Sequence, residues 1–190
     1  MSEQWPGDEP DEPEEADAAE GDADDEPELR VVEHDEADGL HVPDDVELLE
    51  GEVRGTRRGV GIVLSRANAA AADAMLQAAL EELDAVHVGR EHVTVMLVPG
   101  AFELALGAMA LAKTRRYACI VALGDATDHG VIASETASGL QLAALETGVP
   151  VAFGVLIEAG DAAERATEAV RRALEMSDLF QQLRAAAKAH

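Results

Sequence analysis

The sequence predicts a three-layer α/β/α sandwich built around a four-stranded parallel sheet. Four short apolar runs recur along the chain, and each is followed by a segment whose apolar residues have helical spacing. The runs themselves lack the polar alternation of half-exposed strands, which is typical of strands covered by helices on both faces. Right-handed crossovers then distribute the helices over both faces. The predicted strands are VGIVL at 60–64, VTVMLV at 93–98, CIVALG at 119–124 and PVAFGVL at 150–156.

Four helices are expected between and after these strands. Asn68 is a favourable N-cap for the first helix. Apolar side chains three or four residues apart give each helix a face to bury. The expected helices cover about 69–86, a stretch ending near 113, about 132–147 and about 161–187. The expected buried positions include Met75, Leu76, Ala79, Leu80 and Leu83 in the first helix, Leu104, Ala108 and Leu111 in the second, and Leu174, Leu179 and Leu183 in the last.

Charge divides the chain into an acidic tail, residues 1–49, and a domain, residues 50–190. Residues 1–50 contain 22 Asp or Glu and one basic residue, Arg30, whereas residues 51–190 contain 17 acidic and 13 basic residues. The tail has five prolines and few large apolar side chains, so it cannot bury enough surface to offset its ordering entropy. It is predicted to be disordered, either as a solubilising segment or as a docking segment for cationic cargo or a basic partner.

Composition also limits the classes of partner and ligand. A formal net charge of −25 argues against nucleic acid and anionic membranes as partners. The one cysteine, Cys119, excludes an intrachain disulfide and a zinc site of several cysteines. No cofactor or metal is expected. No signal peptide or apolar membrane-spanning stretch is recognisable, so the expected compartment is the cytoplasm.

The geometry of a parallel sheet predicts where ligands bind. They lie beyond the carboxyl ends of the strands, which here means the segments 65–68, 99–103, 124–130 and 154–160. The segment EGEVRGTR at 50–57 precedes the first strand and is interpreted as an edge element that could pair with a neighbouring subunit.

Several motifs in order resemble the lumazine synthase family, which makes 6,7-dimethyl-8-ribityllumazine in riboflavin biosynthesis. They are EGEVRG, GIVLSRAN, VPGAFELALGAMALAKTRRYACIVALG, GLQLAALETGVPVAFGVL and ALEMSDLFQQL, and together they cover about 50–187. The resemblance implies a lumazine-synthase/flavodoxin-like fold and self-association into pentamers, which in many members close into icosahedral shells. It also implies active sites between neighbouring subunits.

The resemblance transfers part of a binding site to this chain. The turn Gly100–Ala101–Phe102–Glu103 matches the family turn that contacts the ribityl-substituted pyrimidine. The alternative is that Phe102 belongs to the core and Glu103 is a first-turn residue favoured by the helix dipole. Phe153 matches the family phenylalanine near the ring, or is plain core. Ala67 and Asn68 occupy the family's lid loop, where Ala67 replaces a residue that stacks on the heterocycle.

Both phosphate-binding loops depart from the family pattern, which runs close to GAVIRGxTPHFEYVANE in the first loop. Here residues 124–135 cover that path with five fewer residues and carry Asp125 and Asp128 in place of RGxT. His129 is the candidate proton shuttle, or else an exposed loop histidine. The second loop is some ten residues shorter. Arg165 is its best match to the phosphate arginine, or pairs instead with Asp161 on the helix surface.

These departures lead to four functional hypotheses. The leading one is a homo-oligomeric scaffold without lumazine synthase activity, and a related one is a shell whose acidic tail recruits cargo. The alternative is a divergent active synthase that uses His129 and Glu103. A further hypothesis is a binding module that holds a flavin-like or pyrimidine ring beside Phe102.

Overall fold

The structure is a computed structural model that describes residues 42–43, 45–46, 48–55, 59–127 and 129–189. The predicted tail therefore lies largely outside the described residues. Strands and helices alternate in the predicted order, with one short 3-10 turn between the first helix and the second strand. The elements are β1 (Gly59–Ser65), α1 (Ala69–Ala85), η1 (Arg90–His92), β2 (Val93–Val98), α2 (Leu104–Lys113), β3 (Tyr117–Asp125), α3 (Gly130–Thr147), β4 (Val151–Leu156) and α4 (Ala162–Ala189).

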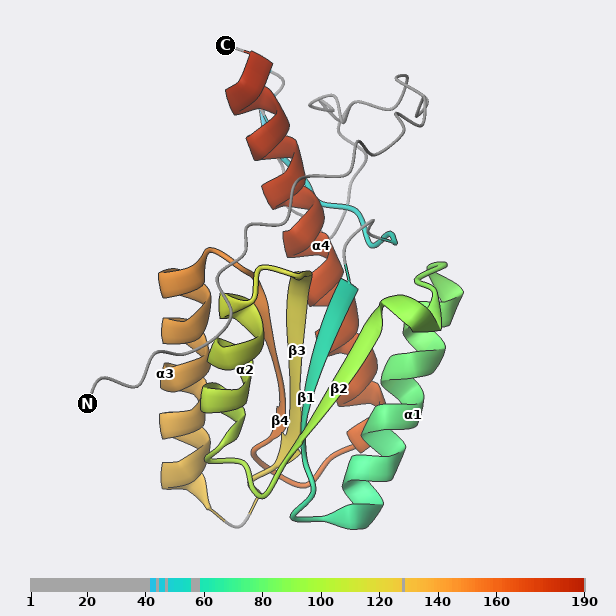
Figure 1. Cartoon of the computed structure of the whole chain (residues 1–190), viewed down its shortest axis with the longest axis vertical. Helices are drawn as coiled ribbons and strands as arrows, with labels where there is room; N and C mark the ends of the chain where they lie inside the picture. The colour runs from blue at the N-terminus through green and yellow to red at the C-terminus, as the bar shows by residue number, and fades with distance from the viewer. Residues whose placement is uncertain (1–41, 44, 47, 56–58, 128, 190) are drawn as a thin grey trace, which may run out of the picture.

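The four strands form one parallel sheet in the order β2-β1-β3-β4. Helices α1 and α4 cover one face, and α2 and α3 cover the other, so the predicted three-layer α/β/α sandwich is confirmed (Figure 1). Each face has its own core, because inward side chains alternate along the strands. Ile62 and Val121 face α1 and α4, whereas Val63 and Ile120 face α2 and α3.

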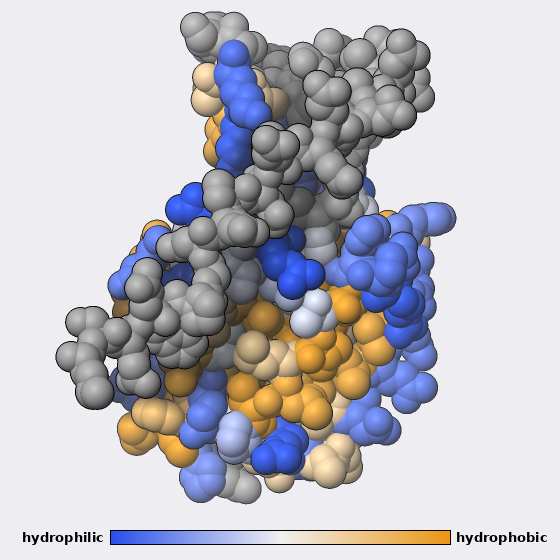
Figure 2. Space-filling model, in the orientation of Figure 1, coloured by the Kyte–Doolittle hydropathy of each residue, from blue (hydrophilic) through white to orange (hydrophobic). Residues whose placement is uncertain are grey.

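Strand β2 is less buried than the sequence predicts. Val95 is 38% exposed and Leu97 is 61% exposed, although both belong to a continuous apolar run. The strand lies at an edge of the sheet, where helices cover it incompletely. Figure 2 shows apolar surface where β1 and β2 lie in Figure 1. An apolar run thus predicts a strand but not its place in the sheet.

Helix α4 differs from the prediction in its second half. Leu174 is buried as expected, but Leu183 is 47% exposed, and Asp178 and Gln182 are buried in its place. The prediction that Leu183 anchors the helix is therefore wrong. The reason is that this half of α4 extends past the sheet and packs against a polar segment rather than the apolar core (Figure 1).

That polar segment is the described part of 50–57, for which the sequence suggested an edge element that could add a strand to the sheet or pair with a neighbouring subunit. Residues 50–55 form no strand with the described sheet. Instead, Asp178 accepts hydrogen bonds from the Glu52 N–H at 3.0 Å and from Arg54 Nε at 2.6 Å. Gln182 Nε2 donates to the Glu50 carbonyl at 3.0 Å. Backbone and side-chain hydrogen bonds to α4 therefore replace strand pairing within this chain.

Candidate functional site

The loop after β1 contains two predicted contact residues, Ala67 and Asn68, and both lie on the surface. The Arg66 N–H donates to the Val98 carbonyl at 3.0 Å, which joins the carboxyl ends of β1 and β2. Asn68 Oδ1 accepts a hydrogen bond from the first turn of α1, which confirms the predicted N-cap. Asn68 Nδ2 donates to Asp125 Oδ2 at 2.7 Å. Asn68 therefore links this loop to the end of β3.

The turn after β2 presents an aromatic ring beside a carboxylate. Phe102 is 65% exposed, so the alternative that it belongs to the core is wrong. Ala101 is buried, and its carbonyl accepts a hydrogen bond at 3.0 Å from the buried Thr136 hydroxyl of α3. Glu103 is the N-cap of α2, and its Oε2 lies only 3.1 Å from the position a Cβ on Gly100 would take. The carboxylate therefore folds back over the turn.

The loop after β3 is organised around the Asp125 carboxylate. Asp125 Oδ1 accepts hydrogen bonds from the Thr127 N–H at 3.0 Å and the Thr127 hydroxyl at 2.8 Å, and Oδ2 accepts the Asn68 amide. The Thr127 N–H lowers the pKa of Asp125 most strongly. The Asn68 amide and the Thr127 hydroxyl add to this effect, while desolvation opposes it. This carboxylate is therefore ionised at neutral pH.

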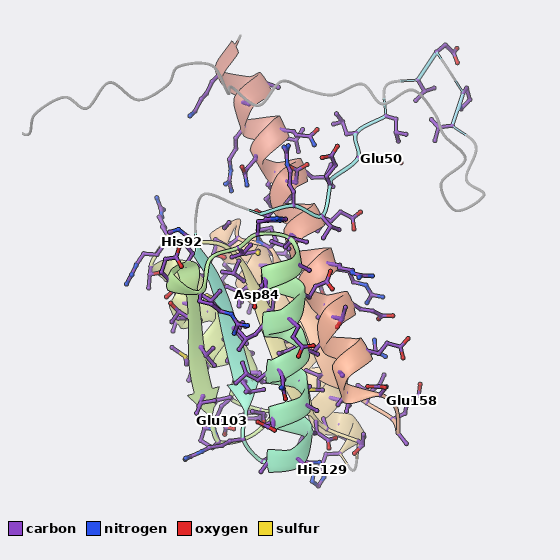
Figure 3. All side chains as sticks on the ribbon, turned by 90° about the vertical axis from the view of Figure 1, so that its right-hand side faces the viewer. Glu50, Asp84, His92, Glu103, His129 and Glu158 are labelled. Carbon is purple, nitrogen blue, oxygen red and sulfur yellow. The ribbon has the colours of Figure 1, made fainter. Side chains whose placement is uncertain are left out.

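His129 lies directly before α3 and is exposed. Its N–H donates to the Ala126 carbonyl at 3.0 Å, but its imidazole does not cap the helix. Glu103 and His129 lie at the same end of the molecule (Figure 3). Within the described part of the chain, however, no hydrogen bond or ion pair orients the imidazole or joins it to Glu103. Asp128 lies outside the described residues.

Phe153 and Arg165 lie apart from the three loops that contain Asn68, Phe102 and Asp125. They line a cavity of about 410 Å³ between the end of α3, the edge strand β4 and helix α4. Since β4 and β2 lie at opposite edges of the sheet, one chain does not bring all the predicted contacts into a single site. The other lining residues are Ala144, Leu145, Val149, Pro150, Val151, Ala152, Arg172, Ala173, Met176 and Phe180.

Arg165 does not make the surface pair considered from the sequence. Its Nη1 lies 3.8 Å from Glu168 Oε2, and the same carboxylate oxygen accepts a hydrogen bond from Arg172 at 3.2 Å. Asp161 Oδ1 instead accepts from the Ala163 and Glu164 N–H groups at the start of α4. Two guanidinium groups that line the cavity therefore share one carboxylate.

Three features of these sites were not predicted from the sequence. They are the Asn68–Asp125–Thr127 hydrogen-bond network, the Thr136 support of the turn, and the contribution of Arg172, Met176 and Phe180 to the cavity. Only the last has a sequence signal, since Arg165, Arg172, Met176 and Phe180 recur at helical spacing. The first two join segments that are distant in the chain.

Other chemistry is sparse in the described residues. Burial raises the pKa of the Cys119 thiol to about 12, so it is not a nucleophile at neutral pH. No group of three or more His, Cys, Asp or Glu side chains in the described ranges could hold a metal ion. No helix among them is long and apolar enough to cross a membrane.

Comparison with known proteins agrees with the fold. A family model described as 6,7-dimethyl-8-ribityllumazine synthase matches residues 58–181. A protein of that name from Edwardsiella ictaluri (strain 93-146) is 37% identical over 156 residues, which span 74% of this chain and all of the relative. Another of that name, from Yersinia pestis (strain Pestoides F), is 36% identical over 136 residues, spanning 68% of this chain and 81% of the relative.

The first of these alignments also measures how much shorter this chain is. Of its 190 residues, 74% is about 141, so the chain spans the whole relative with about 15 fewer residues than the 156 aligned positions. The match over most of the chain and the shared fold establish one conclusion: the chain belongs to the 6,7-dimethyl-8-ribityllumazine synthase family.

Proposed function

We propose that this chain is a lumazine-synthase-like subunit that assembles into homo-oligomers, pentamers or larger shells, and does not make lumazine. The family reaction joins a ribityl-bearing aminopyrimidine to a four-carbon ketone phosphate. It needs a slot for a flat ring, an anion site for phosphate and a proton shuttle. Phe102 and Glu103 are the retained candidates for the slot, whereas Arg165 and His129 are weaker candidates for the anion site and the shuttle among the described residues.

The observation that carries the proposal is the Asp125 carboxylate in the loop matched to the phosphate cradle. It already accepts hydrogen bonds from the amide of Asn68 and from the backbone N–H and the hydroxyl of Thr127. Its lowered pKa keeps it ionised. Two like unit charges 4 Å apart repel by about 1 kcal/mol in water and about 4 kcal/mol at an effective dielectric constant of 20. A phosphate would meet repulsion and few free donors in this loop.

The proton shuttle is the second weakness of the site. A general base needs a partner that fixes its ring and its tautomer. The described neighbours of His129 provide no such partner. One unoriented, exposed histidine does not compensate for charge-assisted phosphate contacts that contribute about 1.5–3 kcal/mol each.

Surface composition supports self-association. Four apolar side chains of α2 and α3 are more than half exposed, and the cavity beside β4 is also lined mainly by apolar residues. Large apolar side chains exposed on neighbouring helices are candidates for contact with another subunit. A neighbouring chain could also bring the Phe153 cavity to the Phe102 turn, which lie apart within one chain. The exposed side chains are Leu106 at 73%, Val131 at 78%, Leu142 at 52% and Leu145 at 74%.

One sample can test both halves of the proposal. The full chain is incubated with the two substrates while product fluorescence is recorded, and the same preparation is analysed by native mass spectrometry. The Edwardsiella ictaluri relative serves as the positive control. We expect an intact oligomer and no product. Product formed within about tenfold of the control rate would contradict the proposed lack of activity.

Assembly has its own test in Leu106→Glu, which places a charge on the exposed apolar surface of α2. We expect a shift to smaller species in native mass spectra and an unchanged circular dichroism spectrum. Ala70→Glu adds the same carboxylate at an exposed position of α1 and should leave the mass unchanged. An unchanged mass for Leu106→Glu would remove this surface from the interface.

The alternative is a divergent active synthase that uses His129 and Glu103. It is favoured by the names of the relatives and by the location of both residues at one end of the sheet (Figure 3). Under this alternative, His129→Ala lowers kcat by about 10²–10⁴-fold, as expected for loss of a general base. An active enzyme unaffected by this substitution would reject the mechanism.

The retained slot also supports a binding role for a flavin-like or pyrimidine ring. Phe102 is exposed beside Glu103 and can stack on a flat heterocycle. Titration with riboflavin should show saturable quenching of its fluorescence, and Phe102→Ala should weaken it. The absence of a saturable change would dismiss this role.

A further inference from the structure

Three cationic residues are neighbours in the sequence at the end of α2. Lys113, Arg115 and Arg116 are all exposed, and none forms a hydrogen bond or ion pair through its side chain within the described part of the chain. We refer to these three residues as the 113–116 patch. Cations are favourable at a helix C-terminus, which explains one such residue but not three.

Most other described cations do have partners. Arg54 pairs with Asp178, Arg90 with Asp84, and Arg171 with Glu82. Arg165 and Arg172 share Glu168, and Arg184 donates to a backbone carbonyl. Only Arg66 and Lys188 are unpaired elsewhere among the described residues, and neither has another unpaired cation beside it in the sequence. The 113–116 patch is therefore a local excess of positive charge on an acidic protein.

The patch lies at the amino ends of the strands. Arg116 directly precedes Tyr117, the first residue of β3, which pairs with Gly59 at the start of β1. The sequence repeats the Thr-Arg-Arg triplet directly before Gly59, at 56–58. Those three residues lie outside the described part of the chain, and the patch is defined without them.

The acidic part of the chain enters the domain at this same end. Glu50 is held on the distal half of α4 through Gln182, and α4 extends past the amino ends of the strands (Figure 1). Glu50 lies at the end opposite Glu103 and His129 (Figure 3). Residues 1–41, which precede this point, contain 18 acidic residues and one basic residue, Arg30.

We propose that the 113–116 patch is the docking surface for the acidic residues 1–41 of the same protein, from its own or a neighbouring subunit. The proposal does not depend on whether the domain has synthase activity. It rests on charge complementarity and on the point where the acidic stretch joins the domain. Docking there would keep the tail away from the carboxyl ends of the strands, and a basic partner would have to displace it.

Length and charge favour this occupant. Twenty residues of flexible chain have a root-mean-square span of about 25 Å, and residues 1–41 are twice that number. Tethering gives the tail a millimolar effective concentration at its own domain. The net charge of −25 disfavours nucleic acid as a competing occupant. Ion pairs between the acidic tail and the 113–116 patch are each weak and screened by salt, but several of them together stabilise the docked tail.

Carbodiimide cross-linking of the full chain tests the proposal directly. The reagent joins amines to carboxylates, and Lys113 and Lys188 are the only lysines in the sequence. We expect cross-links from Lys113 to carboxylates within residues 1–41, mapped by mass spectrometry. They should exceed those from Lys188 by about fivefold at low salt and fall sharply in 0.5 M salt. A mixture of isotope-labelled and unlabelled chains shows whether the tail of the same or a neighbouring subunit is joined.

A charge-removal variant provides the matched control. Arg115→Gln with Arg116→Gln should lower the Lys113 yield about fivefold, as expected for two exposed ion pairs, while Arg66→Gln should leave it unchanged. Steady-state anisotropy of Trp5, the one tryptophan, should fall in the double variant at low salt. Equal yields from both lysines, a Lys113 yield unaffected by the double substitution, or cross-links only to residues 42–190 would overturn the proposal.

Discussion

Two aspartates at opposite ends of the molecule show how environment decides the role of a carboxylate. Asp178 on α4 is 3% exposed and accepts hydrogen bonds from the Glu52 N–H, Arg54 and Gln182. Asp125 is only half-buried and accepts hydrogen bonds from Asn68 and Thr127, which carry no charge. Both have a lowered pKa. Only Asp178 has a cation beside it within the described residues.

The two carboxylates differ in their hydrogen-bond and ion-pair partners. Burial pushes the pKa of Asp178 upward, but the hydrogen bonds and the Arg54 charge outweigh it, so the pair fastens a distant segment to α4. Asp125 is only partly buried, and its hydrogen bonds to Thr127 close the loop between β3 and α3. The first arrangement stabilises the fold, and the second carries the proposal that this loop does not bind phosphate.

The largest expected effect comes from Asp178→Ala. It leaves Arg54 without its carboxylate and removes one of the two acceptors of the buried Gln182 amide, so we expect the free energy of unfolding to fall by about 2–4 kcal/mol. Urea unfolding measures this. Glu175→Ala, at an exposed position of the same helix, should change it by less than about 0.5 kcal/mol. Similar losses for both variants would show that the Asp178 contacts contribute little.

Acid unfolding tests the contribution of the Asp178 charge separately from that of the size of its side chain. The folded pKa of Asp178 is below the ordinary value of 3.8. Its carboxylate therefore stabilises the fold fully above about pH 5 and loses this contribution as the pH falls through the folded pKa. Asp178→Asn should give a flatter dependence of unfolding free energy on pH between about 5 and 2. Parallel curves for the two proteins would refute this assignment.

Asn68→Ala tests the weaker network. The substitution removes both the N-cap of α1 and a hydrogen bond to Asp125, so we expect a loss of about 1–2 kcal/mol in unfolding free energy. Asn68→Asp keeps the cap but places two carboxylates together, and should raise the pKa of Asp125. If Asn68→Ala unfolds like the unmodified protein, the network does not stabilise the loop.

The smallest effect is expected for His129→Ala. Its imidazole is exposed and makes no capping hydrogen bond, so the unfolding free energy should change by less than about 0.5 kcal/mol and the native mass should stay the same. A larger loss would mean that His129 has a partner in the assembled protein, and would make it a stronger candidate for function.

Most of the fold follows from local patterns in the sequence, and most of the site does not. The apolar runs and the cap at Asn68 predict each strand and helix to within a few residues. The exposure of Leu97 and Leu183 was not predictable, because it depends on which strand forms the edge and where α4 leaves the sheet. Site residues could be proposed from the family motifs, but not their division between the two edges of the sheet.

The sequence by itself determined the α/β alternation, the family motifs, the charge boundary near residue 50 and the shortened loops, because each is a property of neighbouring residues along the chain. Tertiary structure decided the contacts between distant segments. It joined Asn68 to Asp125 across 57 positions and Glu52 to Asp178 across 126. Hydrogen bonds depend on distance in space, and here the order of the strands and the length of α4 set that distance.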